Sequence, residues 1–199
     1  MQTNPIAVDV GVGPRIRLRS GGWLDLLAPH VSEFTIEDIA HGLAHTCRYA
    51  GQADGFYSVA EHNVLVSRTA VGHEYAALMH DAAEAFIGDV TRPLKQLLPD
   101  YKRIEASVEA AIFARFAVEI PAAAVKEADL KVLAAEQAQI MPSGTDSWAL
   151  RAGIEPADVV VERLPPPEAK ERFLTCYHRL RATCSRALGD ELEAFVTPA

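Results

Sequence analysis

The sequence is poor in cysteine and contains no long hydrophobic run. Its three cysteines, Cys47, Cys176 and Cys184, lack CxxC spacing, so we expect reduced, buried thiols and no disulfide framework. No apolar stretch approaches the roughly 20 residues that cross a bilayer, and the first residues lack a basic region followed by an apolar run. These absences predict a cytoplasmic protein with no membrane partner.

Positive charge is also scarce, because 19 Lys and Arg face 27 Asp and Glu and leave a net charge of −8. Duplex nucleic acid is therefore not expected as a partner, since phosphate backbones need clustered Lys and Arg. A small anionic substrate stays compatible with this charge if a metal ion and a few local cations supply the positive field. With 199 residues, 49% of them hydrophobic, the chain fits one globular domain.

Helical periodicity dominates the sequence, and no internal repeat interrupts it. We expect an all-α bundle in a single domain, with an N-terminal arm (1–34), a helical core (35–140) and a C-terminal extension that carries a final helix (141–199). Short strands are expected within 1–22 and at 159–161. The expected helices span about 35–51, where Thr35 and Asp38 form a capping box, then 59–70, 74–86, 101–117, 122–141 and 168–188.

The stretch AALMHDAAEAFIGDVTRP at 76–93 places titratable side chains in an otherwise apolar helix. An unpaired buried carboxylate costs several kcal/mol, so the adjacent His80 and Asp81 call for a metal ion or strong hydrogen bonds. Glu84 follows one helical turn later, which lets all three residues face one site. Neighbouring residues on a helix point about 100° apart, so other helices must complete a metal shell.

Two residues elsewhere suit such a shell. His62 lies in the apolar-periodic SVAEHNVLV, where a lone histidine would be read as a core residue, and Asp129 lies on the mostly apolar side of the helix AVKEADLKVLAAEQ. Together with His80 and Asp81 they form a two-histidine, two-aspartate set. These ligands suit one divalent ion, Mn, Co, Fe, Mg or Zn, without choosing among them. Four ligands with room for water are typical of catalytic sites.

The order of these motifs resembles the HD-domain metal-dependent phosphohydrolases. AEH at 60–62, HDAAEAFIGD at 80–89 and KEAD at 126–129 carry the resemblance, which covers about 35–140 and is greatest to the branch of the bacterial 5'-deoxynucleotidases and phage-type dATP triphosphohydrolases. The resemblance implies that Glu84 and Asp89 orient the attacking water and handle protons. It implies these metal ligands: His62, His80, Asp81 and Asp129. It also implies a homo-oligomer, a dimer or larger.

Arg48 and Tyr49 resemble an Arg-Trp pair of the deoxynucleotidases, in which the arginine contacts phosphate and the aromatic ring packs on the nucleotide. Tyrosine in place of tryptophan leaves the base preference open, and a surface arginine beside a core tyrosine is the structural alternative. Arg92 and Lys95 are further candidates for phosphate contact or else exposed cations. Lys126, three residues before Asp129, could contact either the phosphate or an acidic neighbour, and a solvated charge is its structural alternative.

Three histidines, His30, His73 and His178, lack an acidic partner and are read as structural. His41 and His45 lie one helical turn apart and either line the substrate side or pack. The sequence as a whole predicts a metal-dependent hydrolase of (deoxy)nucleoside 5'-monophosphates. The alternatives are a triphosphohydrolase that releases tripolyphosphate and a nucleotide-binding regulatory module without catalysis.

Overall fold

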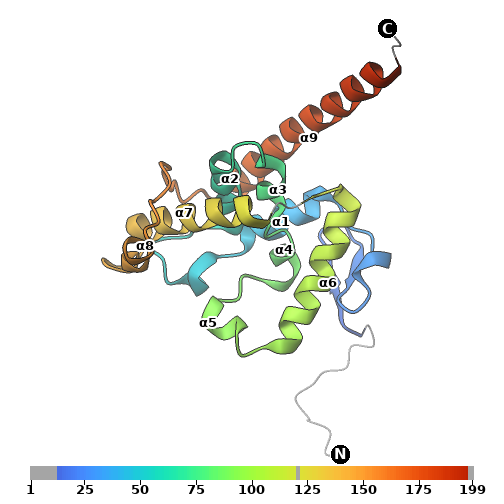
Figure 1. Ribbon diagram of the computed structural model, residues 1–199. Coiled ribbons are helices and arrows are strands. Elements are labelled where there is room, and N and C mark those ends of the chain that lie inside the picture. Colours follow the sequence, from blue (N-terminus) through green and yellow to red (C-terminus); the bar gives the residue numbers. More distant parts are fainter. Residues whose placement is uncertain (1–12, 120–121, 197–199) are drawn as a thin grey trace, which may run out of the picture.

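The computed structural model describes residues 13–119 and 122–196, with side chains for 13–119 and 123–183. These ranges are mostly helical and carry one small antiparallel sheet (Figure 1). The elements are β1 (Arg15–Arg17), β2 (Trp23–Asp25), η1 (Pro29–Val31), α1 (Ile36–His45), η2 (Arg48–Gly51), α2 (Val59–Thr69), α3 (Glu74–Met79), α4 (Glu84–Ile87), α5 (Arg92–Lys95), α6 (Pro99–Phe116), α7 (Ala122–Ile140), α8 (Ser147–Ala152) and α9 (Pro166–Val196).

The N-terminal arm forms a hairpin, although only one strand was expected there. β1 pairs with β2 so that Ile16 lies opposite Leu24. The arm is tied to α1 because the Ser20 backbone N–H donates to Asp38 Oδ1 over 2.9 Å. The part of the arm before residue 13 lies outside the described residues.

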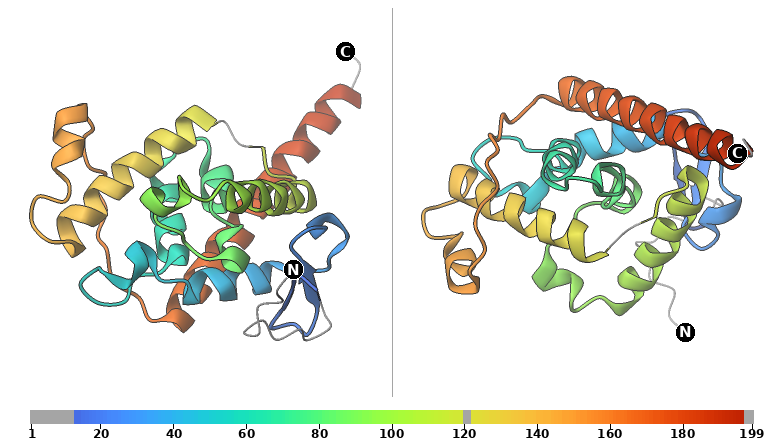
Figure 2. Two further views of the ribbon diagram at one scale, coloured as in Figure 1. Left: turned by 90° about the horizontal axis from the view of Figure 1, so that it is seen from below. Right: turned by 45° about the horizontal axis from the view of Figure 1, so that its top comes forward.

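Helix α2 occupies the centre of the fold. It packs on α3, α7, α9 and α1, and the right view of Figure 2 shows α2 and α3 side by side between α7 and α9. Its residues from Val59 to Ser67 are all buried. A helix without an exposed face is expected only where other helices surround it, so any polar side chain on α2 must find its partners inside the protein.

The first helix begins as predicted but ends early. Thr35 and Asp38 form the capping box, with Asp38 N–H donating to Thr35 Oγ1 over 3.2 Å. The helix ends at His45 rather than Gly51, because Thr46 turns back to the Gly42 carbonyl and the next residues pair with 57–58. That pairing redirects the chain, so Arg48 lies in the short helix η2 and points into the fold.

The predicted helix over 74–86 is broken in the middle. α3 ends at Met79 and α4 begins at Glu84, and tighter backbone bonds such as Glu84 N–H to Asp81 C=O, 3.0 Å, replace the α-helical ladder between them. His80 and Asp81 therefore lie on a turn between two helices. Arg92, placed in a loop by the sequence, opens the single-turn helix α5.

The strand expected at 159–161 is wrong. The backbone there is irregular, and the side chain of Gln139 takes the place of a strand partner: its amide accepts from Val161 N–H and donates to the Val159 carbonyl, at 3.0 and 2.9 Å. This one glutamine thus satisfies the backbone N–H and C=O groups that a neighbouring strand would otherwise pair with. The apolar β-branched residues at 159–161 predicted a strand, but a strand also needs a partner strand, which residue type alone does not provide.

Helices α2, α6 and α7 follow the sequence pattern, whereas no helix was expected where α8 lies. Val108, Ala111 and Ile112 form the buried face of α6, and α9 extends further than the predicted final helix. Pro121, expected in the first turn of α7, lies outside the described residues. Buried apolar side chains form one cluster from Leu18 to Leu180. Across the residues that the structure describes, no helix has the length and apolarity needed to cross a membrane.

Candidate metal centre

His62 lies at the centre of the protein on α2 and is fully buried. Its Nδ1 is 2.5 Å from Glu136 Oε1 on α7. Because a carboxylate can only accept, Nδ1 carries the proton and Nε2 points toward the other side of the ring. There Nε2 lies 3.4 Å from Asp129 and 3.5 Å from Asp81 but makes no hydrogen bond among the described residues.

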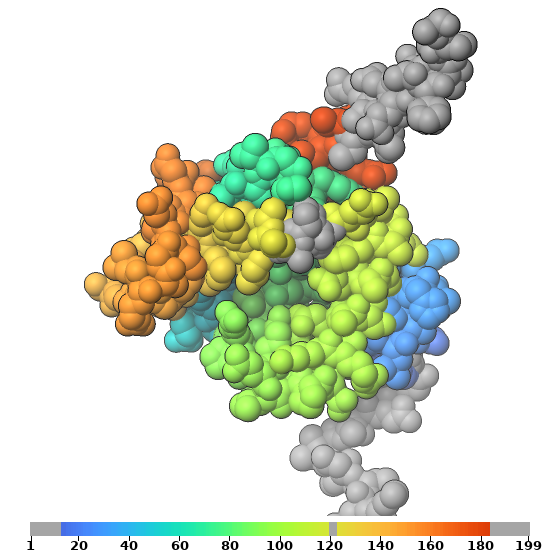
Figure 3. Space-filling view, viewed as in Figure 1, coloured from blue at the N-terminus to red at the C-terminus, as the bar shows by residue number. Residues whose placement is uncertain are grey.

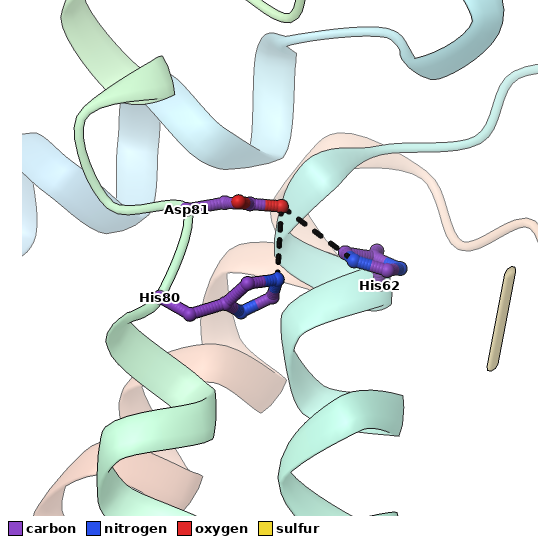
Figure 4. Close-up of side chains that lie close together, drawn as sticks. All are labelled: His62, His80 and Asp81. Carbon is purple, nitrogen blue, oxygen red and sulfur yellow. Dashed lines mark ion pairs between the residues drawn. The ribbon is translucent and has the colours of Figure 1, made fainter. Parts of the chain in front are cut away.

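His80 is oriented in the same way. Its Nδ1 lies 2.7 Å from the Ala77 carbonyl, which accepts, and its buried Nε2 has no hydrogen bond in the part of the chain that the structure describes. Asp81 Oδ2 is 3.1 Å from this Nε2 (Figure 4). Both histidines thus satisfy one ring nitrogen with a protein acceptor and direct the other toward Asp81, which is the arrangement of histidine ligands in metal sites.

These three side chains offer one ligand atom each, and the three atoms lie within 4.8 Å of one another. Asp129 reaches this group beside His62, while its other oxygen is 2.5 Å from Lys126 Nζ. Two imidazole nitrogens and nearby carboxylate oxygens fit a divalent ion. The residues present therefore suit a metal, with three ligands close together and Asp129 adjoining them.

The charges around His62 favour a cation. Burial and the Arg48 guanidinium lower the pKa of His62, but Glu136 and Asp129 outweigh them and raise this pKa to about 9. Burial raises the pKa of Asp81, yet His80 and His62 outweigh burial and bring it well below the ordinary value. The carboxylates around His62 therefore favour a positive charge at its Nε2, which either a proton or a metal ion can supply.

Glu136 is a functional candidate that the sequence analysis missed. Its side chain is fully buried and accepts from four donors: His62 Nδ1, the Tyr57 hydroxyl at 2.7 Å, the Tyr49 hydroxyl at 2.6 Å and Arg48 Nη2 at 3.1 Å. A signal was available, because Glu136 follows Asp129 by seven residues and so shares its face of the helix. This carboxylate fixes the ring of His62.

Glu84 and Asp89, predicted to handle water and protons, line different cavities, and Lys95 lines both. Glu84 is buried, and its Oε2 has no hydrogen bond among the described residues. Burial, then Asp81 and Asp89, raise the pKa of Glu84 well above its ordinary value. Burial raises the pKa of Asp89 as well, against the opposing charge of Arg48. A carboxyl group with a raised pKa can hold a proton closer to neutral pH.

A pocket of about 510 Å³ includes Asp129 and Arg48 in its lining, whereas His62, His80 and Asp81 are not among its lining residues. It lies where α5 and α7 approach each other, and Figure 3 shows the segments α5–α6 and α7 with deeper atoms between them. Four cationic side chains line it together with Asp89 and Asp129, and the other lining residues are mostly apolar, with Thr91 and Gln137 as polar exceptions. The cations are Arg48, Arg92, Lys95 and Lys126.

The predicted substrate residues occupy this pocket in different ways. Arg48 is buried and pairs with Glu136, with Asp81 3.9 Å away, so it is not a surface arginine. Tyr49 lines the pocket, but its hydroxyl is directed inward to Glu136. Arg92 is exposed, whereas Lys95 is held by Glu105 at 2.7 Å and lies 3.8 Å from Glu84. Lys95 therefore lines the pocket and also interacts with Glu84 and Glu105.

A smaller cavity of about 250 Å³ lies on the other side of His80 and Asp81. Glu105 and Glu109 of α6 line it with Glu84 and Lys95, and neither α6 glutamate was singled out from the sequence. His41 and His45 stack on each other with ring centres 4.2 Å apart and are not among the residues that line either cavity. Their packing role fits the structure.

The sequence of this chain is similar to those of two bacterial proteins. No protein-family model matches this chain. It is 40% identical over 152 residues to the uncharacterized protein YfdR of Escherichia coli (strain K12), which covers 74% of this chain and 85% of YfdR. It is 36% identical over 190 residues to the uncharacterized protein RCAP_rcc00048 of Rhodobacter capsulatus, covering 85% of this chain and 96% of that protein. The chain belongs to the family of YfdR and RCAP_rcc00048.

Proposed function

We propose that this protein is an HD-domain metal-dependent phosphohydrolase that hydrolyses (deoxy)nucleoside 5'-monophosphates. One observation carries the proposal: His62, His80 and Asp81, predicted as ligands from separate parts of the sequence, bring their ligand atoms within 4.8 Å of one another. Both histidines have Nδ1 occupied and a buried Nε2 without a hydrogen bond in the described structure. A divalent ion would satisfy both nitrogens.

The three clustered side chains, with Asp129, would hold the ion. When bound, such an ion lowers the pKa of a coordinated water and neutralises phosphoryl charge. The protein's own cations supply a second source of neutralisation: Arg48 presents a planar guanidinium beside Asp81, and Lys95 lies next to Glu84. Fixed cations in a buried site stabilise developing charge without reorganising.

Glu84 and Asp89 handle the proton. Water forms a bond to phosphorus as the bond from phosphorus to the sugar oxygen breaks, and one of these carboxylates takes the proton that the water loses. The leaving alkoxide receives a proton in turn, so the products are orthophosphate and a nucleoside. The raised pKa values of both carboxyls suit this exchange near neutral pH.

The experiment is a screen of nucleoside monophosphates and triphosphates with Mn, Co, Mg, Fe and Zn, in which product identity and bound metal are both measured. We expect orthophosphate from monophosphates, whereas tripolyphosphate from a triphosphate would point to the triphosphohydrolase alternative. His80→Ala and Asp81→Asn should lose bound metal and activity together. His73→Ala, an exposed histidine at the start of α3, is the matched control.

Retained phosphate release in His80→Ala would contradict the proposal. Bound metal and bound nucleotide without any product would favour the regulatory alternative. The predicted homo-oligomer, a dimer or larger, is a separate question. The described apolar residues of α6 and α9 that belong to the buried cluster pack inside the protein itself, and light scattering of the purified protein tests the oligomeric state.

A further inference from the structure

The larger pocket has two chemically different ends. Lys126 and Asp129 mark one end of the stretch of α7 that lines it, Leu130 and Leu133 follow, and Gln137 marks the other end, where Trp148 of α8 also lines the pocket. A phosphate group is bound by cations and hydrogen-bond donors, which an apolar wall with a single amide does not provide. Such a wall suits a ring system with few polar atoms, since binding sites for small molecules combine apolar walls with a few placed polar groups.

Helix α7 spans the distance between the two ends. Gln137 follows Asp129 by eight residues, which corresponds to about 12 Å along the helix axis. Leu130 and Leu133 lie between them and line the same pocket. A ligand with its phosphate beside Asp129 therefore places its other end near Gln137, provided that it is a molecule of nucleotide length.

The amide of Gln137 has a fixed orientation. Trp148 Nε1 lies 2.6 Å from Gln137 Oε1, and an indole N–H can only donate, so the amide must present its oxygen to Trp148. The amide nitrogen makes no hydrogen bond within the described part of the chain. Gln137 therefore offers the N–H groups of its amide as donors to the pocket.

Trp148 belongs to helix α8, which lies beside the C-terminal end of α7 (Figure 1). Ala149 is buried, and its carbonyl accepts from both Gly153 N–H and Ile154 N–H, which closes the end of α8. The indole is half-buried. The backbone that carries the ring is thus fixed by the end of α8, and the indole N–H is held by Gln137.

We infer that Gln137 selects the base of the substrate by donating an amide N–H to a ring carbonyl oxygen, and that Trp148 is the positioning residue that orients it. This inference rests on the proposed function and narrows the substrate class to nucleotides whose base carries a carbonyl oxygen at C4 of a pyrimidine or C6 of a purine, as thymine, uracil and guanine do. An exocyclic amino group, as in cytosine or adenine, presents a donor at that place. Two facing donors leave both groups unsatisfied, which disfavours the amino bases.

The test uses two matched substrate pairs, dTMP with dCMP and dGMP with dAMP. The unmodified protein should favour the keto member of each pair in kcat/KM by about three- to tenfold. Gln137→Glu replaces the donor with an acceptor and should invert the preference. Gln137→Met removes both groups and should abolish it, while Trp148→Phe should weaken it because the amide can then rotate.

Bound metal should be unchanged in all three variants, which separates base selection from damage to the metal centre. Glu127→Gln, an exposed change on the same helix, is the control and should keep the preference. Binding of the phosphate-free nucleosides thymidine and deoxycytidine, measured by calorimetry, gives a readout that does not require hydrolysis. The expected result there is tighter binding of thymidine, lost in Gln137→Met.

The two proposals fail in different ways. If no nucleotide is hydrolysed but thymidine is preferred through Gln137, the phosphohydrolase proposal fails and base selection stands. If monophosphates are hydrolysed but the Gln137 variants keep the preferences of the unmodified protein, base selection is overturned. The absence of any base preference in both assays overturns it as well.

Discussion

Glu136 joins His62, a predicted metal ligand, to Arg48, a predicted phosphate contact. It is ionised although fully buried: burial raises its pKa, but Arg48 and His62 outweigh burial and bring the pKa to about 2. Its two oxygens accept from four donors. A buried carboxylate is tolerated only with such compensation, so Glu136 keeps the proton on Nδ1 of His62 and holds Arg48 in the pocket.

Glu136→Gln should weaken both metal binding and folding. The amide presents N–H groups to side chains that are themselves donors, so His62 loses its anionic partner and Arg48 loses its counter-charge. We expect metal affinity to fall by about 10–100-fold and the free energy of unfolding to fall by about 3 kcal/mol. Metal titration and urea unfolding measure the two effects.

The matched control is Glu127→Gln on the same helix, where an exposed glutamate pairs with Lys131. Exposed pairs contribute between zero and about 1 kcal/mol, so that variant should bind metal normally. Unchanged metal affinity in Glu136→Gln would show that the carboxylate does not orient His62.

At the residue scale, the sequence predicted the clustered ligands and missed their support. His80 and Asp81 were recognisable because an adjacent histidine and aspartate are unusual in an apolar helix. Glu136 lies in a helix that also carries exposed charges, and the sequence alone does not say that Tyr49, Tyr57 and Arg48 converge on it. The inward direction of the Tyr49 hydroxyl follows from the same convergence.

At the scale of elements, α1 and α4 approach most closely at Gly42. A Cβ added there would lie 2.3 Å from the Ala85 carbonyl oxygen and 2.8 Å from Ala85 Cβ. Contacts under 3.0 Å with backbone require movement of one helix. Ala85 directly follows Glu84, so any shift of α4 also moves the carboxylate that is proposed to handle protons.

Gly42→Ala should therefore destabilise the protein, although the same change in an ordinary helix interior stabilises it by about 0.5–1 kcal/mol. Overpacking of this kind costs about 1–3 kcal/mol, and we expect a net loss of about 1 kcal/mol or more in urea unfolding. His41→Ala, one position earlier in α1, adds no atoms and loses only its stacking on His45, so it should cost less stability than Gly42→Ala. A more stable Gly42→Ala protein would contradict the contact.

Element boundaries were predictable where local chemistry fixes them. The capping box of Thr35 and Asp38 fixes the start of α1 within the sequence itself. The end of α1 at His45, the break between α3 and α4 and the irregular chain at 159–161 depend instead on distant partners, residues 57–58 and Gln139 among them. Periodicity carries no information about such partners.

At the scale of the whole molecule, the candidate site joins segments that are far apart in the sequence. His62 comes from α2, His80 and Asp81 from the turn after α3, and Asp129 from α7. In the protein without a cation, three carboxylates, Asp81, Asp129 and Glu136, share this buried region with Arg48 and His62. An ion bound there would connect α2, α3 and α7, and because the unfolded chain has no such arrangement, binding would stabilise the fold.

Added metal should therefore raise the unfolding temperature in a manner that depends on metal concentration. At a free concentration 100 times the Kd, binding contributes about 2.7 kcal/mol, which for a chain of this length corresponds to about 5–10 °C. Thermal unfolding with Mn, Co or Zn, reversed by a chelator, measures the shift without any substrate. Asp81→Asn should abolish it while His73→Ala keeps it. An equal shift of the unfolding temperature in Asp81→Asn would place the bound ion elsewhere. Asp81 faces both His62 and His80, so a metal bound among these three residues must bind more weakly, and stabilise the fold less, once the carboxylate is removed.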